Sequence, residues 1–125
     1  MGSWRRKLFV AALSIASVAA VRAQQPDPEI QSAFIEGAQR LEAGDFEAAA
    51  RIFRELTLKT DSPRIKLELA RALFYLGQYD ESRRLFRAVA LEPELPWRVR
   101  DNIEVFLRAI DDVDGAWQAL RIEAW

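Results

Sequence analysis

The stretch Gly77-Gln78-Tyr79-Asp80-Glu81-Ser82, with Phe86 shortly behind it, decides the fold. The same pattern occurs 33 residues earlier as Gly44-Asp45-Phe46-Glu47-Ala48-Ala49, again followed by a phenylalanine, Phe53. A period of 33 to 34 residues is typical of helix-turn-helix units that stack side by side. We therefore expect two copies of one helical hairpin.

Each repeated position has a reason in packing. Gly44 and Gly77 allow a tight turn between two helices without strain from a Cβ atom. The small residue in the first helix of each copy, Gly37 or Ala70, lets the second helix approach closely. The phenylalanines behind the two turns then fill the space between neighbouring copies.

Apolar residues recur at spacings of three and four from Pro28 to Leu120, which favours helices throughout. The turn signals between them are Gly44-Asp45, Asp61-Ser62-Pro63, Gly77 and Glu92-Pro93-Glu94-Leu95-Pro96. Asp45 and Ser62 are expected to cap the helices that follow them. The sequence thus predicts an all-α fold, a tetratricopeptide-like hairpin array of two repeats, with a fifth helix from about Pro96 to Asp112 as its cap.

The N-terminus has the features of an export signal. Residues 4–7 are basic apart from Trp4, residues 8–21 form an apolar run, and Val21-Arg22-Ala23 offers small residues before a cleavage point. We expect a signal peptide over residues 1–23, a linker over 24–29, a repeat domain over 30–112 and a tail over 113–125. An uncleaved anchor and a twin-arginine signal remain the alternatives for the first segment.

Composition excludes several classes of function. The 125 residues include no cysteine and no histidine, which removes the common nucleophile systems and the usual zinc ligands. Four of the 18 cations lie in residues 1–23, so residues 24–125 hold 14 cations against 19 anions, a net charge of −5. A net-negative body argues against nucleic acid as a partner. We expect no catalysis, no cofactor, no metal and no small-molecule substrate.

The repeated block looks like a tetratricopeptide repeat, and a narrower resemblance covers roughly Pro63 to Asp112. That segment is similar to the periplasmic repeat domain of the surface lipoprotein assembly modifier family. The residues that carry it are Leu67-Glu68-Leu69-Ala70-Arg71-Ala72-Leu73-Phe74, Gly77, Tyr79, Phe86, Val99-Arg100-Asp101-Asn102-Ile103, Phe106, Leu107, Ile110 and Asp111. The resemblance implies a periplasmic domain that helps an outer-membrane β-barrel to move lipoproteins or secreted proteins to the cell surface.

The barrel of that family is not expected within residues 1–125. Even eight strands need about ten residues each, and only 13 residues follow Asp112. A truncated or split frame, a separately encoded barrel and a stand-alone domain all fit this difference. The tail, which contains Trp117 and Trp125, is either a frayed amphipathic helix or disordered end, or the start of a barrel strand.

We expect a non-catalytic module in the periplasm, in contact with the outer membrane through a partner, that binds an exported protein client. The inner face of the array is the expected binding surface, since first helices line it in stacked pairs. The candidate partner-binding residues are Phe34, Arg64, Leu67, Arg71, Phe74, Tyr75, Arg100, Glu104 and Arg108. The alternative is a structural scaffold or assembly adaptor of the cell envelope that acts through self-association.

Overall fold

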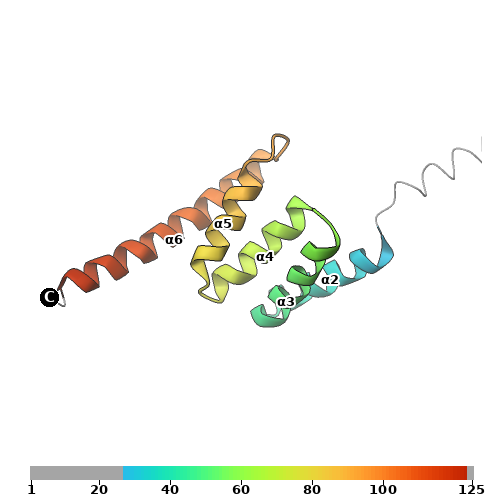
Figure 1. Ribbon diagram of the computed structural model, residues 1–125, viewed down its shortest axis with the longest axis horizontal. Coiled ribbons are helices and arrows are strands. Elements are labelled where there is room, and N and C mark those ends of the chain that lie inside the picture. Colours follow the sequence, from blue (N-terminus) through green and yellow to red (C-terminus); the bar gives the residue numbers. More distant parts are fainter. Residues whose placement is uncertain (1–26, 124–125) are drawn as a thin grey trace, which may run out of the picture. The chain divides into compact units, whose positions relative to one another are not determined.

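The computed structural model describes residues 27–123 of the chain. All regular structure in this part is helical, as expected from the spacing of apolar residues. The helices are α2 (Pro28–Glu42), α3 (Phe46–Lys59), α4 (Pro63–Tyr75), α5 (Tyr79–Ala90) and α6 (Trp97–Glu123), shown in Figure 1. The expected signal peptide lies outside the described residues, and α2 begins inside the segment expected to be linker.

The turns inside the two hairpins depend on glycine. Gly44 and Gly77 have φ angles of 80° and 78°, in a region that residues with a Cβ rarely adopt. Asp45 then caps α3, because its carboxylate accepts a hydrogen bond from the Ala48 N–H at 3.3 Å. Ser62 stands at the same position before α4, with Pro63 opening the helix, but its hydroxyl makes no capping bond.

The first repeat is packed around Phe53. Its ring is fully buried and meets the ring of Phe34 edge to face, with 5.6 Å between centroids. A Cβ atom added to Gly37 would lie 2.8 Å from Cζ of Phe53. The absence of a side chain at Gly37 is therefore what lets the Phe53 ring lie against α2.

The second repeat shares its core with α6. Ala70, Phe86 and Val89 form one buried cluster with Ile103 and Ile110 of α6. Helix α6 thus packs on α5, in agreement with the expected role of the fifth helix as the cap of the array. Burial of such side chains is the main source of stability in the array, at about 25 cal/mol for each Å² of apolar surface.

Helix α6 is longer than the sequence predicts. It continues through Asp112 to Glu123, so that residues 113–123 of the tail are helical and not the start of a strand. In Figure 1, α6 runs on past the beginning of α5. Among the described residues, no helix combines the length and the apolar character needed to cross a membrane.

Candidate functional site

A groove of about 510 Å³ lies where the beginning of α4, the end of α5 and the beginning of α6 meet. We call it the α4–α6 groove. Its lining comprises the apolar residues Pro63, Leu67, Val89, Leu95, Pro96 and Val99 together with Ser62, Arg64 and Glu68. The first helices of successive units line the inner surface of a stacked array, where ligands bind. Because α4 and α6 hold these two positions, the groove is the candidate binding site.

Arg64 supplies the positive charge at the edge of this groove. It is exposed at the first turn of α4, and its guanidinium carbon lies 4.7 Å from the ring centroid of Phe34. Stacking on an aromatic face fixes the plane of a guanidinium while leaving N–H groups at its edge for a ligand. Among the residues that the structure describes, no carboxylate lies within ion-pair distance of Arg64.

Arg71 lies about two turns further along α4, but its charge is already partnered. Its Nη1 donates to a carboxylate oxygen of Glu68 at 2.9 Å. Pairs of this spacing on one helix contribute only tenths of a kcal/mol, about 0.2–0.5. A carboxylate of a binding partner would therefore compete with Glu68 for Arg71. At Arg64 it would have no such competitor among the described residues.

The two aromatic candidates on α4 differ in exposure. Phe74 is half-buried and its ring contacts Phe106 of α6 at 5.0 Å between centroids. Tyr75 is 48% exposed and stacks on Phe46 of α3 at 4.7 Å. Phe74 thus belongs mainly to the packing between α4 and α6, while Tyr75 keeps one side of its ring open to solvent.

Arg100 has a structural role that the sequence did not reveal. Its Nη1 donates to the carbonyl oxygen of Ala90 at 3.0 Å, and its Nη2 lies 3.4 Å from that of Glu92. These carbonyls lie at and just beyond the end of α5, where a helix has backbone acceptors without a partner in the helix. Arg100 holds this turn, whereas Glu104 and Arg108 are exposed on α6 and do not line the groove.

Sequence reasoning missed the far wall of the groove. The sequence presents Leu95 and Pro96 only as part of a turn that ends a helix, and Val99 only as part of the expected fifth helix. In the structure all three line the groove together with Leu67. For Leu95 and Pro96 the available signal was their apolar character within an otherwise acidic turn.

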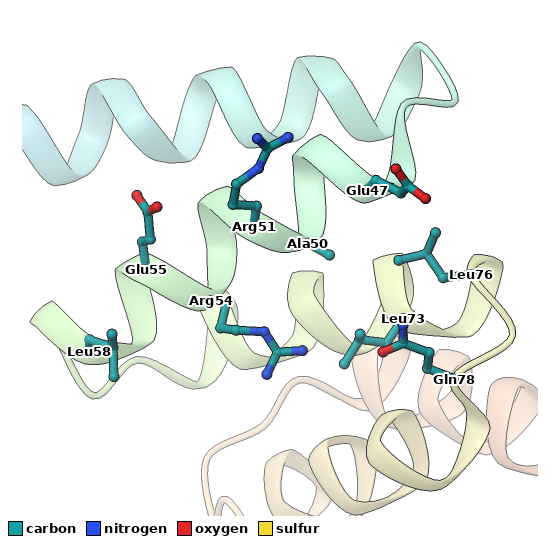
Figure 2. A pocket seen from close by; sticks show the side chains of 9 residues that line it. All are labelled: Glu47, Ala50, Arg51, Arg54, Glu55, Leu58, Leu73, Leu76 and Gln78. Atoms are coloured by element: carbon teal, nitrogen blue, oxygen red, sulfur yellow. The ribbon is translucent and has the colours of Figure 1, made fainter.

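Figure 2 shows a second hollow, of about 490 Å³, along α3 and the turn between α4 and α5. Four charged side chains line it, and the sequence-predicted residues do not. Arg54, which belongs to this lining, makes two hydrogen bonds to Glu81 of α5, at 2.6 and 3.1 Å. The bonds from Arg54 hold the pKa of Glu81 below its usual value and raise the pKa of Arg54. Arg54, at the side of this hollow, is thus held in a pair that joins the two repeats.

Comparison with known proteins agrees with the repeat pattern. Residues 40–94 match the family model described as the tetratricopeptide repeat. Searches of curated proteins and of solved structures find no match, and nothing in these comparisons supports the narrower resemblance to the surface lipoprotein assembly modifier family. The described part of the chain is an all-α, tetratricopeptide-like array of helical hairpins, a fold that generally mediates protein–protein interaction and is typically non-catalytic.

Proposed function

We propose that this chain is a non-catalytic interaction module that holds a segment of a protein client in the α4–α6 groove. The observation that carries the proposal is the combination of an apolar lining with one stacked, exposed guanidinium at its edge. The lining offers Leu67, Leu95 and Val99 to an apolar side chain. Arg64 offers paired N–H donors, which match a carboxylate.

The client segment that fits this chemistry carries an apolar side chain next to an acidic one. Burial of the apolar side chain would contribute most of the affinity, at about 1.5–3 kcal/mol for a residue of leucine size. The contact between Arg64 and the carboxylate would fix the register of the segment. Tyr75, further along α4, would extend the contact surface beyond the groove.

We further propose that the client is an exported lipoprotein or secreted protein met in the periplasm. The basic and apolar segments of residues 1–23 support export of the chain. The resemblance of Pro63–Asp112 to a periplasmic repeat domain supports a role beside an outer-membrane β-barrel. On this proposal the chain captures and positions the client by a rigid surface, without chemistry.

Capture of the client from bacterial cells tests both proposals, that the α4–α6 groove is the binding site and that the client is an exported protein. Tagged full-length protein, expressed in a bacterium that exports it, should retain an exported protein after mild cross-linking. Arg64→Glu should abolish retention, and Arg64→Lys should reduce it, because lysine keeps the charge but loses the paired donors. Arg51→Glu, the same charge change at an exposed site on α3 outside the groove, should leave retention intact.

The outcomes separate the parts of the proposal. Equal retention by Arg64→Glu and the unmodified chain would show that the α4–α6 groove is not the site. Retention of a client that lacks any export signal would contradict the periplasmic proposal while leaving the groove in place. Circular dichroism of each variant checks that its helices remain formed.

A further inference from the structure

We propose that the C-terminal part of α6 pairs in antiparallel fashion with α6 of a second copy of this chain. The contact surface is the α6 stripe, defined as Val113, Trp117 and Leu120. This proposal goes beyond client binding and is independent of it, because none of the three residues lines the α4–α6 groove.

The α6 stripe continues a face of α6 that is already used for packing. Phe106 and Ile110, at the same spacing of three and four, contact the core around Phe86 and Val89. Beyond Ile110 the apolar pattern continues along α6, but these side chains are largely exposed to solvent. Trp117 is 61% exposed and Leu120 is 57% exposed.

The end of α6 lacks a packing partner in the described part of the chain because α5 is shorter than α6. Helix α5 has 12 residues and α6 has 27. Arg83 in the first turns of α5 contacts Asp111 and Asp114 of α6. Residues 115–123 extend past that point by about 14 Å of helix, at about 1.5 Å per residue. A helix of a second copy would continue the contact that α5 begins.

Charges favour a second copy in the antiparallel orientation. Arg83 is surrounded by three carboxylates, those of Asp80, Asp111 and Asp114, so this cluster has an excess of negative charge. Arg121 follows Asp114 by seven residues, about two turns, and therefore lies on the same side of α6. Antiparallel pairing centred near Trp117 brings each Arg121 to the acidic cluster of the other copy. Parallel pairing would instead place the two Arg121 side chains together and the two acidic clusters together.

The arrangement is a two-fold contact in which each copy uses the same surface. Short helical overhangs bury less than the roughly 1,200 Å² at the lower end of stable interfaces. We therefore expect a weak dimer whose population depends on protein concentration.

Sedimentation equilibrium of the full chain tests this, in a concentration series from about 1 to about 200 µM, the range suited to a micromolar dissociation constant. We expect a monomer–dimer equilibrium. Trp117→Asp should raise the dissociation constant at least about tenfold, because a charge replaces the central aromatic contact. Its matched control is Trp97→Asp. Trp97 is 68% exposed on the same helix, and twenty residues before Trp117, about five and a half turns, it lies on the opposite side.

Three results would overturn the proposal. A monomer at every concentration would show that the α6 stripe does not pair. An equal loss of association in both tryptophan variants would show that the contact does not involve this face. The third concerns the dissociation constant of Arg121→Gln, which we expect to rise about two- to fivefold if the dimer is antiparallel. Stronger association of Arg121→Gln would indicate parallel pairing. A thermal melt of each variant confirms that the hairpins remain folded.

Discussion

The two repeats solve the same packing problem with different side chains. In the first, the ring of Phe53 lies directly on Gly37, where the backbone of α2 offers no side chain. In the second, Ala70 takes the position of Gly37, and Phe86 stacks on Phe106 of α6 at 4.9 Å. The second phenylalanine therefore packs on the next helix of the array, whereas the first packs against the glycine of its own hairpin.

A second difference lies one turn earlier in α3 and α5. Ala49 and Ser82 occupy equivalent positions, and both are fully buried. The Ser82 hydroxyl donates to the carbonyl oxygen of Ala70 at 2.8 Å, which ties α5 to α4. At this position the first hairpin has an apolar side chain, while the second adds a buried polar bond. The same backbone unit can thus be stabilised by either means.

The largest expected effect comes from removing the close contact in the first repeat. Gly37→Ala places a Cβ within 3.1 Å of three atoms of the buried Phe53 ring. Overpacking of this kind costs about 1–3 kcal/mol, which exceeds the gain of about 1 kcal/mol in helix propensity. We expect urea denaturation to show a net loss of up to about 2 kcal/mol in the free energy of unfolding.

Gly115→Ala is the matched control for this substitution. Gly115 lies in α6, and a Cβ there would meet nothing within 4 Å. The same change should therefore raise the stability of that helix, by up to about 1 kcal/mol. A stabilising Gly37→Ala would contradict the close approach of Phe53. In a Phe53→Leu background, the cost of Gly37→Ala should fall, because leucine reaches less far than the phenylalanine ring.

A smaller effect is expected from the polar bond of the second repeat. Ser82→Ala copies the residue found at the equivalent position, so it introduces no clash and removes only the hydroxyl. We expect a loss of about 1 kcal/mol in the free energy of unfolding, typical of a single buried hydrogen bond.

The reverse change, Ala49→Ser, sharpens the same comparison. If the two hairpins share one backbone geometry, the new hydroxyl can donate to the carbonyl of Gly37, and the cost should stay within about 0.5 kcal/mol. A loss of 2 kcal/mol or more, about the cost of an unpaired buried polar group, would show that the first hairpin cannot accommodate the bond used by the second. Both variants are measured by the same denaturation curves.

The repeat architecture could be predicted from the sequence because its signals are local. Gly44 and Gly77 mark turns by their conformational freedom, and the 33-residue echo places equivalent apolar residues in equivalent helices. The family match over residues 40–94 and the helical packing agree with that prediction. What local patterns specify here is the hairpin and its stacking.

The end of α6 and the role of Arg100 could not be predicted in this way. The sequence predicts an end of the fifth helix at about Asp112, among the carboxylates of Asp111, Asp112 and Asp114. In the structure the helix continues, and Arg83 of α5 neutralises part of that charge. Arg100 likewise acts on carbonyls of another segment. The continuation of α6 and the role of Arg100 both depend on contacts between residues far apart in the sequence, which a sequence pattern does not display. The choice among the candidate site residues remains a prediction.

The smallest expected effect concerns the ion pair that joins the two repeats, Arg54 of α3 with Glu81 of α5. Their side chains are 49% and 33% exposed, so solvent screens the pair, and Glu81→Gln should cost at most about 1 kcal/mol at pH 7. The pKa of Glu81 is lowered in the folded state, chiefly by its hydrogen bonds from Arg54. The stabilisation is therefore present above the unfolded pKa of about 4.3 and is lost as the pH falls through the folded value.

Denaturation at pH 7 and near pH 3 should show that the deficit of Glu81→Gln in the free energy of unfolding shrinks in acid. The control Glu55→Gln, at an exposed carboxylate elsewhere on α3, should show little deficit at either pH. A deficit that persists unchanged in acid would mean that Glu81 holds the repeats together by packing and not by charge.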